Sequence, residues 1–114
     1  MTPTLIAILL ALSVAHAEDH GQFDGYDLNN KQKQWFGKVL DTSGTPCCGV
    51  ADGYPVDYKI LGGHYWVLFK GEWHKVPPTA VIRKFGNPIG VAIAWFMDIG
   101  GNPEVRCFVP GPEG

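Results

Sequence analysis

Cysteine and histidine side chains in this chain are suited to thiol chemistry. A thiolate at Cys48, with His64 or His74 as its base, is the arrangement of a cysteine hydrolase. Such a thiolate is usually held at the start of a helix, whose dipole lowers the thiol pKa. Residues 49–55 contain two glycines and a proline and do not form a helix of useful length. This argues against a Cys/His thiol enzyme, which is kept as an alternative.

The same cysteines are expected to staple the domain. A disulfide from either Cys47 or Cys48 to Cys107 would close a loop of about 60 residues and contribute roughly 4 kcal/mol. The sequence leaves open which of the two adjacent cysteines is used, and a strained bond between them is the alternative. The remaining thiol is then either buried or free to form a covalent dimer.

The start of the mature chain is a second candidate site. If cleavage falls after Ala17, the new N-terminus reads Glu18-Asp19-His20. A free amine, two backbone amides and the imidazole of His20 form a square-planar set that suits Cu(II) or Ni(II). Metal capture by this leader is therefore an alternative function, and no cofactor is expected in the domain itself.

Residues 1–17 are typical of a secretory signal peptide. An apolar stretch from Leu5 to Val14, broken only by Ser13, ends at Ala15-His16-Ala17, the small-x-small pattern of a cleavage site. The stretch is too short to span a membrane, which takes about 20 residues. We expect a periplasmic or extracellular protein with no membrane span in the mature chain.

The rest of the chain is expected to be one small domain. Residues 18–26 are acidic, polar and contain glycine, which is typical of a flexible leader, and residues 27–110 follow as a single disulfide-stapled domain. A chain this short buries only a modest core, so a covalent link helps to stabilise it. The formal net charge of −2 gives no indication of a basic surface for nucleic acid.

One helix and five short strands are expected to position these residues. Asp27 to Leu40 is predicted to be helical, capped by Asp27 or Asn29. Apolar and alternating runs between glycine and proline turns predict five strands: Val56–Ile60, His64–Lys70, Glu72–Val76, Gly90–Met97 and Val105–Val109. The strand from Gly90 is apolar on both faces and is expected to lie centrally. The predicted fold class is α+β, with the helix packed on a small five-stranded, mostly antiparallel sheet or a partly closed barrel.

Aromatic side chains on the predicted strands form a third candidate site. Tyr58, Tyr65, Trp66 and Trp73 are expected on neighbouring strands. Because strand side chains alternate between the two faces, those on the outer face would form an apolar platform. A platform of this kind suits a partner protein, a peptide or a glycan.

Four motifs resemble a family of small exported bacterial proteins of unknown function. In chain order they have the patterns CCGxADG, GGHYWV, GEWxxVP and RCFxPG, at residues 47–53, 62–67, 71–77 and 106–111. The resemblance spans about residues 34–111 and implies export and a shared fold, but no activity. Relatives often carry a further cysteine near the position of Gly53, so a second disulfide is not implied here.

These patterns favour a non-catalytic exported module that binds a ligand or belongs to the cell envelope. Metal capture at His20 and thiol chemistry at Cys48 remain the alternatives, and an enzyme is not favoured.

Overall fold

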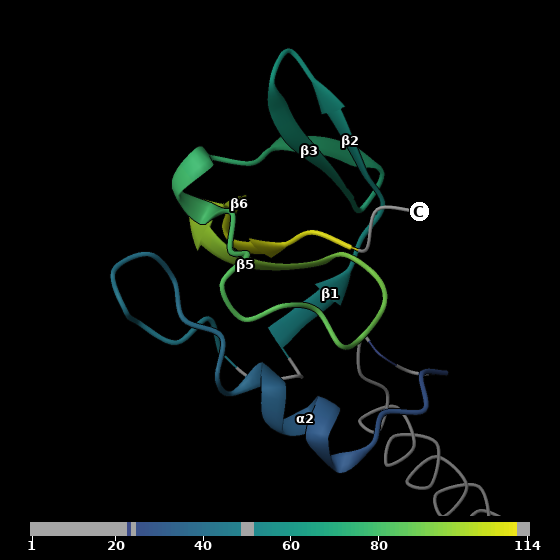
Figure 1. The fold of residues 1–114 in the computed structure, drawn as a ribbon. Helices are drawn as coiled ribbons and strands as arrows, with labels where there is room; N and C mark the ends of the chain where they lie inside the picture. The colour runs from purple at the N-terminus through teal and green to yellow at the C-terminus, as the bar shows by residue number, and fades with distance from the viewer. Residues whose placement is uncertain (1–22, 24, 49–51, 112–114) are drawn as a thin grey trace, which may run out of the picture.

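The structure is a computed structural model that describes residues 23, 25–48 and 52–111. Its elements are helix α2 (Asn30–Phe36), the 3-10 helix η2 (Pro78–Ala80) and the strands β1 (Gly53–Pro55), β2 (Tyr58–Leu61), β3 (His64–Phe69), β4 (Glu72–Lys75), β5 (Ile93–Ile99) and β6 (Asn102–Val109). They form three layers (Figure 1). The β1–β5–β6 sheet lies between helix α2 on one side and the β2–β3–β4 sheet on the other.

Helix α2 is shorter than the predicted segment at both ends. Asn29 has an extended backbone, so the helix cannot begin at Asp27, and its side chain forms a reciprocal capping box with Gln32. At the other end, Gly37 and the residue after it donate to carbonyls three positions back, which tightens and closes the last turn. The predicted cap at Asn29 is confirmed, and the predicted end at Leu40 is wrong.

The strands form two three-stranded antiparallel sheets. The prediction of a small, β-rich module with one helix is confirmed, but the single five-stranded sheet or barrel is wrong. Pro55 has no N–H for a continuing ladder, and the backbone then changes partner within two residues. The Val56 N–H donates to Ala92 beside β5, whereas the Asp57 carbonyl accepts from Leu68 in β3. The chain therefore leaves one sheet and enters the other at residues 56–57.

The first half of strand β5 is buried on both faces, as its apolar sequence predicts, whereas Met97, Asp98 and Ile99 are exposed. Ile93 and Trp95 join Phe36 of helix α2 in one hydrophobic cluster, while Ala94 and Phe96 belong to a second cluster shared with the β2–β3–β4 sheet. Alternation along one strand thus supplies side chains to two cores. The middle sheet holds the helix and the outer sheet together.

Strand β6 contains a β-bulge at Arg106. Trp95 pairs with Cys107, but the next residue of β5, Phe96, pairs with Val105, so Arg106 is the extra residue. Strict alternation would place Val105 and Phe108 on opposite faces, yet both lie in the core between the sheets. The bulge therefore sends Val105 into that core.

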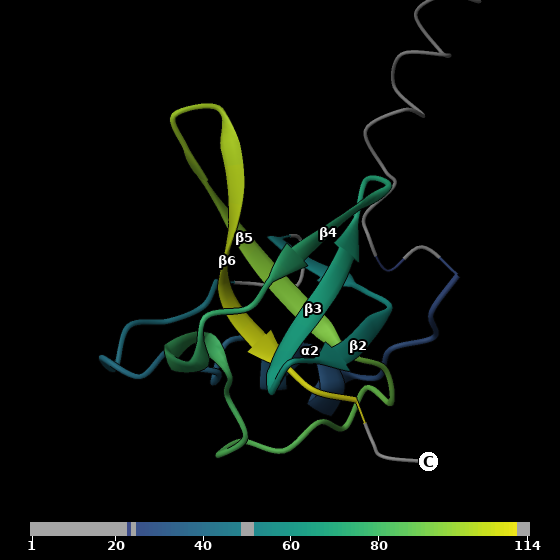
Figure 2. The ribbon, with the colours of Figure 1, turned by 90° about the horizontal axis from the view of Figure 1, so that it is seen from above.

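The part of the chain that the structure describes contains three hairpins, each closed by two residues with positive φ. They are Gly62-Gly63, Lys70-Gly71 and Gly100-Gly101. Positive φ at both positions suits the two-residue turns whose twist matches that of the strands. The β3–β4 and β5–β6 turns project from the same side of the molecule (Figure 2).

The packed part of the chain includes a residue of the predicted leader. Phe23 is 8% exposed and contacts the ring of Phe36 edge-on, with centroids 5.2 Å apart. The predicted signal peptide, residues 1–17, lies outside the described residues. In the part of the chain that the structure describes, no helix has the length and apolar character needed to cross a membrane.

Candidate functional site

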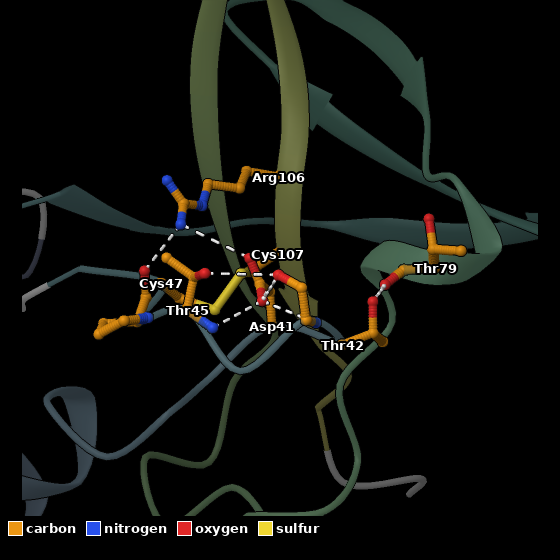
Figure 3. Close-up of a disulfide and its surroundings, with 9 residues drawn as sticks. Asp41, Thr42, Thr45, Cys47, Thr79, Arg106 and Cys107 are labelled. Atoms are coloured by element: carbon orange, nitrogen blue, oxygen red, sulfur yellow. Dashed lines mark hydrogen bonds and ion pairs between the residues drawn. A yellow bond between two sulfur atoms is a disulfide. The ribbon is translucent and has the colours of Figure 1, made fainter.

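A disulfide between Cys47 and Cys107 joins the loop after helix α2 to strand β6 (Figure 3). Of the pairings that the sequence left open, this is the one formed, and it closes a loop across a separation of 60 residues. Both half-cystines are fully buried in the cluster on the helix side of the middle sheet. The bond therefore lies inside the core rather than on the surface.

Arg106 adds a polar link beside the disulfide. Its guanidinium donates to the Pro46 carbonyl at 2.9 Å and lies 3.5 Å from the Asp41 carboxylate (Figure 3). Asp41 also accepts hydrogen bonds from the Ser43 hydroxyl and from the N–H groups of Ser43 and Thr45. These bonds, the Ser43 hydroxyl foremost, hold the pKa of the Asp41 carboxyl below its usual value, and Arg106 contributes less. The arrangement organises the loop that carries Cys47.

Cys48 is the free cysteine of the described residues, and it is exposed. Its backbone has a φ of 95°, a region that favours glycine. An exposed thiol is available to form a disulfide with a second molecule. The covalent dimer through Cys48 stays a prediction.

The two histidines considered as a base for Cys48 lie on opposite faces of the outer sheet. His64 lies in β3, and His74 in β4 pairs with Val67 of β3, so His74 shares the face of Val67. Val67 is three residues after His64, and because side chains alternate along a strand, His64 lies on the other face. The ring of His74 faces inward against Phe96, with centroids 6.1 Å apart. The histidines therefore do not converge on one site.

The predicted copper or nickel ligand, His20, lies outside the described residues, so metal capture there stays a prediction. Across residues 23, 25–48 and 52–111, no group of three or more His, Cys, Asp or Glu side chains is placed to hold a metal ion.

The four aromatic residues of the predicted platform divide between the two faces of the outer sheet. Tyr58 and Tyr65 point inward, where their rings lie 5.7 and 5.1 Å from the ring of Phe108. The Tyr65 hydroxyl accepts a hydrogen bond from Arg83. These two tyrosines therefore pack between the sheets.

Trp66 and Trp73 lie on the outward face of the β2–β3–β4 sheet. Trp66 pairs with Lys59 on one neighbouring strand and with Lys75 on the other, and its indole N–H donates to the Leu61 carbonyl at 3.2 Å. Trp73 is 41% exposed, and the Lys59 ammonium lies 4.2 Å from its ring centroid. Because paired residues share a face, we define the tryptophan face as Lys59, Leu61, His64, Trp66, Leu68, Trp73 and Lys75.

A second candidate site is an open cleft of about 530 Å³ beside the β3–β4 and β5–β6 turns. The rings of Phe69 and Phe96 are stacked in its wall with centroids 4.0 Å apart. Its lining comes from four strands and the segments beside them: Asp52, Tyr54, Phe69, Lys70, Phe96, Met97, Asp98, Gly101 and Pro103. Sequence reasoning missed this cleft, because its residues are far apart in the chain and all but Asp52 lie outside the four motifs.

Comparison with known proteins assigns no family: no protein-family model, no curated protein and no solved structure matches the chain. The class of protein is therefore defined by the fold and its surfaces. It is a small, β-rich, disulfide-linked module with two three-stranded sheets, an outward tryptophan face and an aromatic cleft.

Proposed function

We propose that this protein is an exported, non-catalytic binding module and that its tryptophan face binds an anionic glycan. The observation that carries the proposal is the row of Lys59, Trp66 and Lys75 across three neighbouring strands. The register puts a lysine on each side of Trp66, and the Lys59 ammonium lies over the indole of Trp73, so the face offers both apolar rings and positive charge to the same ligand.

The shape of the face favours a glycan. Sugar rings present flat C–H surfaces that pack on an indole, and a regular sheet holds Trp66 and Trp73 on one outward side. Carboxylate or phosphate groups of the glycan would pair with Lys59 and Lys75. Asp57 lies on the same side beside Leu68, at the end of the face away from Leu61. The positive charge of the face comes from Lys59, whose ammonium lies over Trp73, and from Lys75, which pairs with Trp66.

Export is supported by the buried disulfide, because such bonds persist in oxidising compartments such as the periplasm or the extracellular space. The apolar stretch at residues 5–14 and the small-x-small pattern after it support the same localisation.

The test is a binding titration of the mature protein with polygalacturonate, followed by tryptophan fluorescence. We expect saturable binding that weakens as salt is raised, because exposed charges are screened. Trp73→Ala should reduce the affinity about tenfold or more, as expected for an aromatic anchor.

Two controls separate the tryptophan face from other exposed groups. Tyr26→Ala removes an aromatic ring of similar exposure, 40%, that packs on Phe23 instead, and it should leave the affinity unchanged. Dextran, which is uncharged, should bind much more weakly than polygalacturonate. Equal binding of the two polymers, or tighter binding of polyglutamate than of polygalacturonate, would contradict the anionic glycan as ligand.

A further inference from the structure

We propose that the cleft beside the β3–β4 and β5–β6 turns binds a small organic ammonium ion that carries an apolar body. This inference is independent of the tryptophan face, which lies on the opposite side of the outer sheet from the aromatic residues of the cleft.

The apolar lining of the cleft is made of ring systems. Phe69 and Phe96 are stacked, and the ring of Tyr54 meets each of them edge-on, with centroids 4.9 and 5.9 Å away. Met97, beside them, is 43% exposed and brings a polarisable thioether to the rim. Aromatic faces of this kind attract cations through their quadrupoles and also bury apolar groups.

The charges around the cleft are mainly negative. Asp52 and Asp98 are part of the lining. Glu72 pairs with Phe69 across the β3–β4 hairpin, and Glu104 pairs with Met97 across the β5–β6 hairpin. Because directly paired residues project from the same face, Glu72 lies on the face of the outer sheet that carries Phe69, whereas Glu104 lies with Met97 on the face of the middle sheet opposite Phe96. This charge distribution complements a cation and disfavours an anion.

Lys70 occupies the position that the proposed ligand would take. It is the basic residue of the lining, and its ammonium lies 5.2 Å from the ring centroid of Phe69. The protein thus places an ammonium group of its own over this aromatic wall. A ligand ammonium would compete with Lys70 for the same ring.

The volume of about 530 Å³ is within the range of small-molecule sites and accommodates an amine with a ring-sized body. The apolar body would pack on Met97 and the aromatic wall, and the ammonium would lie over the ring of Phe69 in a cleft that Asp52 and Asp98 also line.

The test is a titration of the full mature protein with phenethylammonium, followed by amide chemical shifts in nitrogen–proton correlation spectra. We expect saturable shifts at Lys70, Gly71, Met97 and Asp98, with millimolar or tighter affinity. The neutral analogue 2-phenylethanol should bind about tenfold more weakly, and 3-phenylpropionate should cause no saturable shift at these residues.

Three variants sharpen the test. Asp98→Asn should weaken binding of phenethylammonium by about three- to tenfold, because it removes a charge partner. Lys70→Asn should strengthen binding by about threefold, because the competing ammonium is gone and asparagine tolerates the positive φ of this turn. Asp27→Asn removes one negative charge, as Asp98→Asn does, but at an exposed position before helix α2, and it should leave the affinity unchanged.

Several results would overturn the proposal of an ammonium-binding cleft. Shifts that saturate equally with the amine and the alcohol, shifts confined to other residues, or weaker binding by the Lys70→Asn protein would overturn it. The absence of any saturable shift at millimolar amine would overturn it as well.

Discussion

Asp41 holds the loop before Cys47 through hydrogen bonds that its charged form accepts. The hydroxyl and N–H of Ser43 and the N–H of Thr45 all donate to one carboxylate oxygen. The folded state therefore lowers the pKa of Asp41 from its ordinary value of 3.8. A carboxyl with a lowered pKa stabilises the fold at pH values above its ordinary pKa, and this stabilisation is lost as pH falls through the lower folded value.

This gives a prediction for pH-dependent stability. Asp41→Asn should lower the melting temperature by a few degrees at pH 7, and the difference from the wild-type protein should shrink as the pH falls below 3.8. Thermal unfolding followed by circular dichroism at pH 7 and in acid measures this. Asp27→Asn is the control, and a constant difference between Asp41→Asn and wild type across this pH range would contradict the role of Asp41.

The role of a single residue could be predicted from the sequence where the residue type alone decides that role. The adjacent cysteines and Cys107 indicated a disulfide, but nothing in the residue types distinguished Cys47 from Cys48. Alternation indicated that the aromatic platform would divide between faces, yet the face taken by Trp66 depends on the sheet that β3 joins. The role of Arg106 depends on a bulge that has no sequence signal.

Strand β1 contacts the core through a residue without a side chain. A Cβ built on Gly53 would lie 3.1 Å from Nε1 of Trp95 and 3.2 Å from Cγ2 of Ile93. Both neighbours are buried in the core on the helix side, so they have little room to move. Glycine at this position lets β1 lie close to the indole.

Gly53→Ala should therefore destabilise the protein by about 1–3 kcal/mol through overpacking. The matched control is Gly37→Ala, because Gly37 has a negative φ and its nearest neighbour would lie 3.6 Å from the new Cβ. Its stability should be unchanged or slightly raised. Urea denaturation measures both variants, and equal stabilities would contradict the close approach of β1 to Trp95.

Elements were predictable where local chemistry decides them. The helix cap at Asn29 and the glycine turns follow from propensities that act within a few residues. The division into two sheets does not, because it depends on which distant strands accept the backbone bonds of Val56 and Asp57. The proline at position 55 marks an interruption, but it does not specify the sheet that the chain enters next.

At the scale of the whole molecule, the disulfide and the two cores act together. Cys107→Ser should lower the free energy of unfolding by about 4 kcal/mol, because the unfolded chain regains the freedom of the closed loop. Cys48→Ser should change the free energy of unfolding by less than about 0.5 kcal/mol, since Cys48 is exposed and takes no part in a disulfide. Chemical denaturation compares the two variants, and similar losses in the free energy of unfolding would show that the Cys47–Cys107 disulfide does not stabilise the fold.

The cleft shows why a site can escape sequence reasoning. Its walls come from β1, β3, β5, β6 and neighbouring residues, so it exists only once both sheets are assembled. Each contributing residue is ordinary for a strand or a turn. The tryptophan face, by contrast, is confined to three consecutive strands, and its two tryptophans, Trp66 and Trp73, were already among the predicted residues.

All three hairpin turns lie between the two half-cystines, whereas helix α2 lies before the first of them. A protease that cuts the backbone at any one of these turns would therefore release no fragment. The two pieces would stay tethered as one molecule of nearly unchanged mass and would separate only when a reductant is added.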